Sequence, residues 1–169
     1  AYSPAPVVTP EIEARIRREI IEPTLAGMIA EGRPFSGFLY AGVMVGRDGT
    51  PRVLEFNTRL GDPETQPLLF RLKSDFCAVL LAAVRGEPLP ALAWDPRPAL
   101  AVVLAAEGYP GPVRRGDAIT GLDADADDAD AKIFHAGTRR DGEAVLSDGG
   151  RVLAVTALGA DLAAAQAKA

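Results

Sequence analysis

Two oxygen-bearing side chains alternate with apolar ones in the run Val53-Leu54-Glu55-Phe56-Asn57. Alternate residues of a β-strand share a face, so we expect Glu55 and Asn57 on one face, with Leu54 and Phe56 holding the other face against a core. Two strand rises of roughly 3.3 Å each put the Cα atoms of Glu55 and Asn57 about 7 Å apart, so both side chains can reach one ion. A carboxylate and an amide oxygen suit Mg²⁺, whose other ligands are commonly waters and substrate phosphates. The spacing predicts one edge of a metal site.

An arginine and a helix start follow this strand. If the strand continues briefly, Arg59 emerges on the same side as Glu55, where its guanidinium can hold a phosphate or carboxylate through two parallel hydrogen bonds. The run Asp62-Pro63-Glu64 combines a capping acid, a proline and a second acid, which is typical of the first turn of a helix. A helix N-terminus attracts anions. Metal ligands, a cationic clamp and a helix terminus in one segment are what phosphoryl transfer requires.

The same residues also have ordinary structural interpretations. Glu55 could be a water-exposed carboxylate on an edge strand, and Asn57 could belong to the turn that follows. Arg59 could be a surface cation, and Asp62 could serve only as a helix cap. Residue types alone leave both interpretations open.

The segment before this strand is expected to hold a helix and the first strand of a hairpin. Thr9-Pro10-Glu11 predicts the helix start, Pro23 a kink or division, and Gly32 the end. The nearly uninterrupted apolar run at 38–45 predicts a strand covered on both faces. Asp48-Gly49 predicts the turn that joins the two strands.

A helix and then a β-rich part are expected after the motif. Apolar residues at a spacing of about four predict a single helix that ends at Gly86: Leu68, Leu72, Phe76, Leu80 and Ala83. The proline-containing stretch 87–98 indicates a boundary between two structural units. Beyond it, glycine and aspartate turns separate short β-like runs, which predict a small, largely antiparallel sheet or barrel with a closing helix from Asp161. The runs lie at 99–106, 117–122, 132–135, 144–146 and 151–156.

Composition excludes several classes of protein. The chain has 169 residues, 48% of them hydrophobic, and a formal net charge of -5 without a basic block, so we expect a globular protein that does not bind nucleic acid. No apolar stretch is long enough to span a bilayer, which argues against a membrane protein. The single cysteine, Cys77, lies among apolar residues and predicts a core thiol in a reducing compartment, with the cytoplasm as the default location. The chain starts without methionine and stops within an alanine-rich run, so we expect a piece of a longer polypeptide.

Two other features favour structural interpretations over functional ones. His135 is the only histidine and has no cysteine or second histidine to join it, so we expect a packed or hydrogen-bonded strand residue and assign it no role. The five aspartates from Asp123 to Asp130 lack the glycine and the terminal glutamate of an EF-hand loop. A solvated, mobile acidic loop is therefore expected there, and not a calcium site.

Several longer runs resemble the phosphoribosylamine-glycine ligase family, also called glycinamide ribonucleotide synthetases, of the ATP-grasp superfamily. The specific ones are Phe35-Ser36-Gly37-Phe38-Leu39-Tyr40-Ala41-Gly42-Val43-Met44 and Glu55-Phe56-Asn57-Thr58-Arg59-Leu60-Gly61-Asp62-Pro63-Glu64-Thr65-Gln66-Pro67. Further runs resemble the family in the same order along the chain, at 1–6, 103–111, 134–138 and 149–159. Nearly the whole chain is covered.

The resemblance implies an α+β fold in three parts. Residues 1–89 would be the C-terminal half of an ATP-grasp domain, an antiparallel sheet with helices, and residues 90–98 a linker. Residues 99–169 would be a small β-rich, barrel-like C-terminal domain. The family's N-terminal portion, with the glycine-rich loop and lysine over the nucleotide, has no counterpart in this sequence, so the chain alone is expected to be inactive.

The resemblance also implies a reaction and a set of site residues. ATP would phosphorylate the carboxylate of glycine, and the amine of 5-phosphoribosylamine would displace phosphate to give glycinamide ribonucleotide in purine biosynthesis. Glu55 and Asn57 would be the cofactor-binding ligands of Mg²⁺ or Mn²⁺ that bridge the ATP phosphates. Arg59, Gly61 and Asp62 would bind substrate near the acyl phosphate and the phosphoribosylamine, with Arg59 and Asp62 as catalytic residues.

Two other functions stay open. Many ATP-grasp relatives carry an additional acidic metal ligand about a dozen residues before the strand carboxylate, but the stretch from Leu39 to Val45 has no acidic residue. This departure favours the glycine ligases over biotin carboxylase-like enzymes. The alternatives are another ATP-grasp carboxylate-amine ligase with a different acceptor, and a non-catalytic module that binds a nucleotide or a partner protein.

Overall fold

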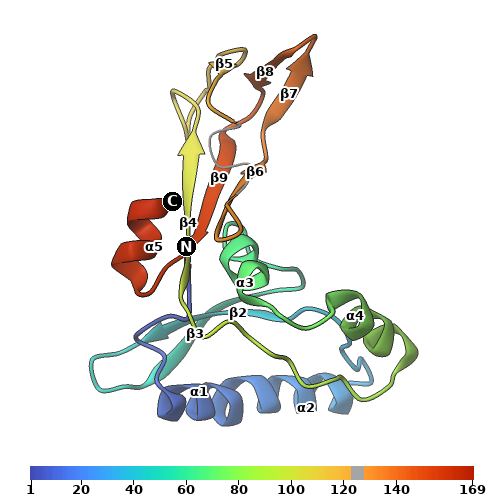
Figure 1. The fold of residues 1–169 in the computed structure, drawn as a ribbon. Helices are drawn as coiled ribbons and strands as arrows, with labels where there is room; N and C mark the ends of the chain where they lie inside the picture. The colour runs from blue at the N-terminus through green and yellow to red at the C-terminus, as the bar shows by residue number, and fades with distance from the viewer. Residues whose placement is uncertain (123–127) are drawn as a thin grey trace. The chain divides into compact units, whose positions relative to one another are not determined.

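The structure is a computed structural model that describes residues 1–122 and 128–169 (Figure 1). The chain divides into two units. The hairpin unit comprises Pro4–Gly61 and Asp75–Ala91, and the sheet unit comprises Ala1–Ser3, Asp62–Ser74 and Leu92–Ala169. Most of the expected acidic loop, at 123–127, lies outside the described residues.

The hairpin unit begins with the expected helix. Helix α1 (Pro10–Ile16) starts where the Thr9 side chain accepts a hydrogen bond from the backbone N–H of Ile12 at 3.3 Å. The π-helical turn η1 (Arg17–Ile21) separates it from α2 (Glu22–Ala30), whose second residue is a proline. Proline has no N–H and crowds the preceding turn, so the wider π turn accommodates it. The predicted division of the helix is therefore confirmed.

Strands β2 (Tyr40–Val45) and β3 (Pro51–Asn57) form the expected antiparallel hairpin. The Asp48 carboxylate shapes the turn, because it accepts hydrogen bonds from the backbone N–H and the hydroxyl of Thr50 at 3.1 Å and 2.9 Å. These bonds hold the pKa of Asp48 below its ordinary value. Gly49 occupies the left-handed region with φ 74°, which glycine adopts without strain.

Burial of the hairpin differs from expectation. Met44, Leu54 and Phe56 expose 56%, 65% and 40% of their surface. A two-stranded hairpin buries little by itself, so its apolar side chains require cover from other elements. The expectations that the first strand is covered on both faces, and that Leu54 and Phe56 are held in a core, are wrong for the described residues.

The single helix predicted from Leu68 to Ala83 is two helices, α3 (Thr65–Arg71) and α4 (Phe76–Arg85). Leu72 leaves the helical conformation, with ψ 122°, and forms an isolated antiparallel bridge with Trp94. The expected start of the helix at Asp62 is also wrong, because α3 begins at Thr65. Periodicity alone did not reveal this break, because the apolar spacing continues across it.

Helix α4 belongs to the hairpin unit and has well-defined ends. The Asp75 carboxylate accepts hydrogen bonds from the backbone N–H groups of Cys77 and Ala78 at 2.9 Å and 3.2 Å. Gly86 closes the helix in the left-handed conformation, with φ 68°, as the sequence predicts. Cys77 is exposed, so the expectation of a core thiol is wrong.

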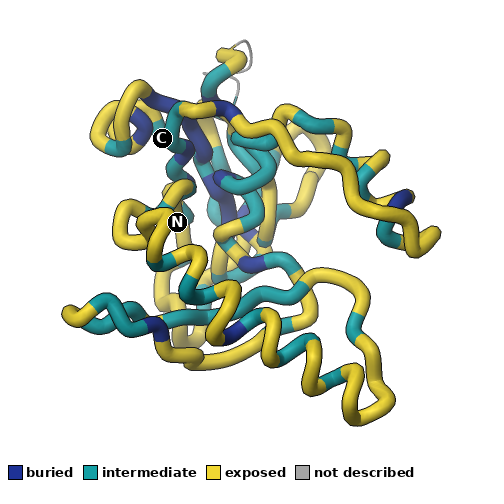
Figure 2. The backbone as a smooth tube through the Cα atoms, turned by 90° about the horizontal axis from the view of Figure 1, so that it is seen from below, coloured by how far each residue is buried: buried dark blue, intermediate teal, exposed yellow. Residues whose placement is uncertain are grey.

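The main sheet of the sheet unit has the strand order β1-β4-β9-β6, with every neighbour antiparallel. Its strands are β1 (Tyr2–Ser3), β4 (Ala99–Ala105), β9 (Arg151–Leu158) and β6 (Ala131–His135). Helices α3 and α5 both contact the two central strands, β4 and β9, and lie on either side of them (Figure 1). Buried residues gather in the strands of this unit, whereas most of the hairpin unit is exposed or half-buried (Figure 2). This sheet is therefore the main core.

Helix α5 (Leu162–Lys168) closes the chain as predicted, with the Asp161 carboxylate accepting a hydrogen bond from the backbone N–H of Ala164 at 2.8 Å.

A second sheet has the order β5-β8-β7, with β5 at Ala118–Ile119, β8 at Ala144–Ser147 and β7 at Thr138–Asp141. The predicted α+β class with antiparallel sheets is confirmed. Within residues 1–122 and 128–169 both multi-stranded sheets are open, so a closed barrel is not found.

None of the helices in the described part of the chain is both long and apolar enough to cross a membrane.

A buried carboxylate joins the loops of the sheet unit. Asp95 is 4% exposed and accepts hydrogen bonds from the Arg97 side chain at 2.9 Å and 3.1 Å and from the Arg97 backbone N–H at 2.9 Å. Lys73 Nζ lies 3.2 Å from the same carboxylate. Arg97 also donates two hydrogen bonds to the Asp130 carboxylate, just before β6. The network connects the extended segment after α3 with the segments that enter β4 and β6.

The charge of this network depends on pH. The hydrogen bonds from Arg97, first its side chain and then its backbone N–H, hold the pKa of Asp95 well below its ordinary value of 3.8. A carboxylate whose pKa is lower in the folded state than in the unfolded state stabilises the fold at pH values above its unfolded pKa. That contribution is lost as the pH falls from about 4 toward the folded pKa.

We predict that Asp95→Asn destabilises the full-length protein at pH 7, lowering the melting temperature by at least several degrees, because two cations lose a buried partner. The difference from the wild type should shrink as the pH falls below about 4. Thermal unfolding between pH 7 and pH 3 measures both effects. Asp141→Asn is the matched control, because Asp141 pairs with Arg139 at 3.3 Å on an exposed strand. Equal melting temperatures for the two variants at pH 7 would contradict the prediction.

Candidate functional site

Glu55 and Asn57 lie on the same face at the end of β3. The side-chain N–H of Asn57 donates a hydrogen bond to Glu55 Oε1 at 3.1 Å. Glu55 is exposed and Asn57 is half-buried, so solvent and ligands can reach both groups. A half-turn of the Asn57 amide exchanges its nitrogen and oxygen. The amide oxygen of Asn57 would then lie beside the carboxylate oxygen Oε1 of Glu55. The pair therefore offers the hard oxygen donors that suit a divalent cation such as Mg²⁺.

Arg59 does not continue the strand. Strand β3 ends at Asn57, and the chain bends at Thr58 and Arg59. The exposed Arg59 side chain donates through Nη1 to the carbonyl oxygen of Leu60 at 3.1 Å. The prediction that Arg59 lies on the same face as Glu55 requires the strand to continue to Arg59. The strand ends at Asn57, so this requirement is not met. The guanidinium still has donors that the Leu60 contact does not use.

Gly61 is the last residue of the hairpin unit, and Asp62 is the first residue of the following segment of the sheet unit. The peptide bond between Asp62 and Pro63 is cis. Arg151 on β9 holds Asp62 twice, since Nη2 lies 2.9 Å from the carboxylate Oδ2 and Nη1 donates to the Asp62 carbonyl oxygen at 3.0 Å. Asp62 thus has an electrostatic partner within its unit in place of the expected capping role.

No local signal in the sequence identifies Arg151 as a partner of the motif. The two residues are separated by 89 positions, and no spacing rule connects a loop with a strand that distant. The register of β9 against β4 places Arg151 opposite Ala105, at the end of the strand pair. A motif search could have found Arg151 only through the resemblance of its surrounding run, Gly149-Gly150-Arg151, to the family.

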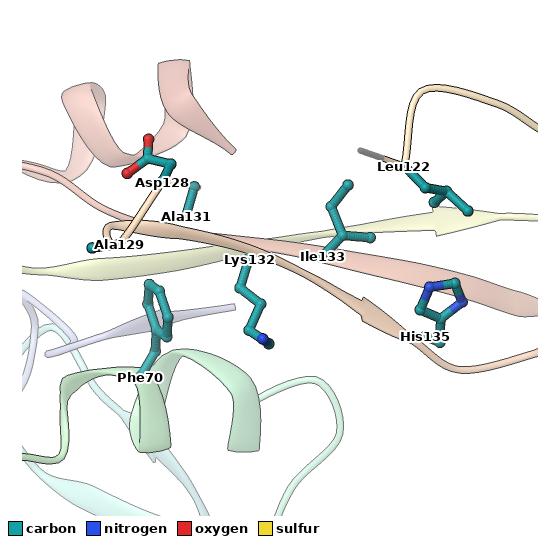
Figure 3. A pocket seen from close by; sticks show the side chains of 8 residues that line it. All are labelled: Phe70, Leu122, Asp128, Ala129, Ala131, Lys132, Ile133 and His135. Atoms are coloured by element: carbon teal, nitrogen blue, oxygen red, sulfur yellow. The ribbon is translucent and has the colours of Figure 1, made fainter. Parts of the chain in front are cut away.

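His135 is the last residue of β6 and is exposed. Its Nδ1 lies 3.0 Å from the hydroxyl oxygen of Thr138, which confirms the expected hydrogen-bonded histidine. It also lines a cavity of about 340 Å³ in the sheet unit, together with Phe70 of α3 and Lys132 of β6 (Figure 3). The residues that line this cavity include none of the predicted site residues. Within the described parts of the chain, no group of three or more His, Cys, Asp or Glu side chains could hold a metal.

Comparison with known proteins identifies the family of this fold. The model of the phosphoribosylglycinamide synthetase ATP-grasp (A) domain matches residues 1–65, and the model of the C domain of the same synthetase matches residues 99–169. The chain belongs to the phosphoribosylglycinamide synthetase family. The family resemblance predicted from the motifs is thereby confirmed, and with it the ATP-grasp fold. ATP binding and the use of a divalent metal are typical of this family.

Individual relatives agree with the domain matches. The chain is 62% identical over 167 residues to a phosphoribosylamine-glycine ligase of Allochromatium vinosum. The aligned residues make up 98% of the chain and 39% of that ligase. The chain is 57% identical over 168 residues to the corresponding ligase of Xanthomonas campestris, which covers 98% of the chain and 38% of that protein. The chain thus spans about two fifths of the length of these curated relatives.

The chain also matches solved structures over nearly its whole length. The crystal structure of phosphoribosylamine-glycine ligase from Thermotoga maritima matches with a TM-score of 0.84 and 33% identity, over 99% of this chain and 40% of that one. N5-carboxyaminoimidazole ribonucleotide synthetase from the same organism matches with a TM-score of 0.66 at 19% identity, over 99% of this chain and 42% of that one. The second likeness is one of fold alone.

We predict that Arg151→Ala loosens the Asp62 loop, residues 58–64 between β3 and α3, more than it destabilises the protein. The pair is partly exposed, with side-chain exposures of 40% and 56%, so the free energy of unfolding should fall by less than about 1 kcal/mol. Amide hydrogen exchange in residues 60–66 should become faster, because both contacts of Arg151 with Asp62 are lost. Arg115→Ala is the control, since Arg115 pairs with Asp148 at 3.5 Å on the surface. Unchanged exchange in residues 60–66 of the Arg151 variant would show that the pair does not hold the loop.

Proposed function

We propose that this chain is part of an ATP-dependent ligase that joins glycine to 5-phosphoribosylamine. The products are glycinamide ribonucleotide, ADP and phosphate. The observation that carries this proposal is the match, over 98% of the chain and at 62% identity, to a protein named phosphoribosylamine-glycine ligase. The side-by-side arrangement of Glu55 and Asn57 supports it, because a phosphoryl-transfer enzyme needs oxygen ligands for a metal.

The proposed reaction has two steps. In the first, a carboxylate oxygen of glycine attacks the γ-phosphorus of ATP, the bond from that phosphorus to ADP breaks, and glycyl phosphate forms. In the second, the amine of phosphoribosylamine attacks the glycyl carbonyl carbon, phosphate leaves and the nitrogen loses a proton. The activation in the first step is necessary because a carboxylate is a poor electrophile, whereas an acyl phosphate has a good leaving group.

Glu55 and Asn57 are the proposed ligands of Mg²⁺ or Mn²⁺. Their donor set fits a hard cation, with one carboxylate and one amide oxygen available at a solvent-accessible strand end. When bound, such an ion neutralises charge on the phosphate oxygens. The residues' own contribution is charge and position: Glu55 supplies the negative charge, and β3 holds the two side chains on one face with one residue between them.

Arg59, Gly61 and Asp62 are the proposed substrate-binding residues. Arg59 would pair with an anionic phosphate through the guanidinium donors that its Leu60 contact leaves unused. Gly61 has no side chain and would allow a substrate to approach its backbone closely. Asp62 would accept hydrogen bonds from the attacking amine, and Arg59 and Asp62 are the proposed catalytic residues.

We propose the domain division predicted from the sequence: residues 1–89 from the ATP-grasp domain, a linker at 90–98, and a C-terminal domain at 99–169. Between the described strands there is no glycine-rich loop followed by a lysine that could cover the phosphates of ATP. The rest of the nucleotide site would therefore come from a further portion of the enzyme. The isolated chain is therefore expected to be inactive. A cytoplasmic location is part of the same proposal, since ATP is available there.

We expect the complete enzyme, supplied with ATP, Mg²⁺ and glycine, to release ADP only when phosphoribosylamine is also present. A coupled assay for ADP, with product identified by mass spectrometry, measures this. Dependence on another amine would favour an ATP-grasp ligase with a different acceptor. The absence of turnover with all amines tested would favour a module that only binds a nucleotide or a partner.

We predict that Glu55→Gln in the complete enzyme lowers kcat/KM by roughly two to three powers of ten. This corresponds to about 3–4 kcal/mol of transition-state stabilisation, the scale expected when a phosphate-bridging metal loses its carboxylate. Initial rates at saturating and limiting Mg²⁺ measure the effect. Glu13→Gln is the control, because Glu13 only pairs with Arg17 at 3.4 Å on the surface of α1. A Glu55 variant with wild-type kcat/KM would refute the metal assignment.

A further inference from the structure

Gly42 lies directly across the hairpin from Glu55. The two residues are partners in the β2–β3 register. A Cβ atom added to Gly42 would approach Glu55 Cγ to 3.1 Å, and the backbone oxygen and nitrogen of Glu55 to 3.6 Å and 3.7 Å. The first of these approaches is closer than ordinary van der Waals contact between carbon atoms, which begins near 3.5 Å. The Glu55 side chain therefore occupies the space that a side chain at Gly42 would need.

The backbone does not require glycine at this position. Gly42 is not among the glycines with positive φ, so an L-residue can adopt its conformation without strain. Glycine in the interior of a strand weakens that strand and often marks a place where another group approaches closely. The group that approaches Gly42 is the Glu55 side chain. Space for that side chain is thus the physical reason for glycine that the structure offers.

The hairpin changes register next to this pair. Gly42 pairs with Glu55, but the next residue, Val43, pairs with Val53, so Leu54 has no partner in the ladder. A bulge of this kind changes the direction of nearby side chains. Glu55 therefore stands next to an irregular point in the ladder, and its Cγ lies 3.1 Å from the position that a Cβ of Gly42 would take.

We propose that Gly42 is a positioning residue that sets where the Glu55 carboxylate can lie, and so tunes the affinity of the metal site. This inference rests on the proposed function. A methyl group at position 42 would push Glu55 Cγ by a few tenths of an ångström, and rotation about the side-chain bonds would carry that shift to the carboxylate. Magnesium requires near-ideal octahedral geometry at 2.0–2.1 Å, so a displacement of this size weakens coordination.

The test compares Gly42→Ala with Gly27→Ala in the complete enzyme. A Cβ at Gly27, in α2, meets no atom within 4 Å, so this variant has the same chemical change without the contact. The probe is Mn²⁺ in the presence of saturating ADP, titrated by electron paramagnetic resonance, together with the Mg²⁺ concentration for half-maximal rate. Gly42→Ala should weaken Mn²⁺ binding and raise the Mg²⁺ requirement about three- to ten-fold. Gly27→Ala should change neither.

Thermal unfolding separates positioning from packing. Alanine in place of a strand glycine reduces the entropy of the unfolded chain, so Gly42→Ala should leave the melting temperature unchanged or slightly higher while metal binding weakens. A melting temperature clearly below those of the wild type and Gly27→Ala would mean that Gly42 serves packing, which overturns the proposal. Unaltered Mn²⁺ binding in Gly42→Ala would overturn it as well.

A double-mutant cycle keeps this inference distinct from the proposed function. If Gly42 acts through Glu55, the effect of Gly42→Ala on Mn²⁺ binding should largely vanish in a Glu55→Gln background. Full additivity of the two substitutions would overturn the positioning role. If Glu55→Gln alone leaves Mn²⁺ binding unchanged, the metal assignment itself fails. If Glu55→Gln weakens binding and Gly42→Ala does not, only the positioning role fails.

Discussion

The sheet unit depends on the pairing of Asp95 with Arg97. A carboxylate that is 4% exposed requires compensation, and Arg97 supplies it with three hydrogen bonds while also reaching Asp130. Arg71 adds a second tie, because its guanidinium donates to the carbonyl oxygens of Asp95 and Arg97. Arg71 is the last residue of α3, so these bonds fix the end of the helix whose other end follows the Asp62 loop. The position of that loop within the unit is therefore set from two directions, by α3 and by Arg151 of β9.

In the hairpin unit, the largely exposed strand β3 presents two polar side chains, Glu55 and Asn57. Cross-strand pairing fixes Asn57 opposite Tyr40 and Glu55 opposite Gly42. Asn57 then reaches Glu55 Oε1, and Gly42 leaves that side chain its space. The geometry of the pair is thus a consequence of register, and a shift by one residue would send both side chains to the other face.

Local signals in the sequence predicted much of this fold. Thr9 and Asp161 cap helices through contacts within three residues, and Gly86 ends α4 through its own backbone conformation. Alternation likewise placed Glu55 and Asn57 together, because strand geometry alone decides it. The break at Leu72 cannot be predicted in this way, because it depends on a bridge to Trp94, 22 positions away, while the local apolar spacing continues through it. Contacts between distant segments leave no mark on local periodicity.

The candidate site has the same division between local and distant determinants. The Glu55–Asn57 pair follows from one strand, but the environment of Asp62 depends on Arg151, which only the fold of the sheet unit brings near. Arg151 contacts one carboxylate oxygen, Oδ2, and the carbonyl oxygen of Asp62. An ionised carboxylate offers about four lone-pair positions, so this contact orients the group and leaves acceptor capacity for the proposed substrate amine. A residue that is held in this way can serve structure and substrate together, and the structural interpretation of Asp62 does not exclude the functional one.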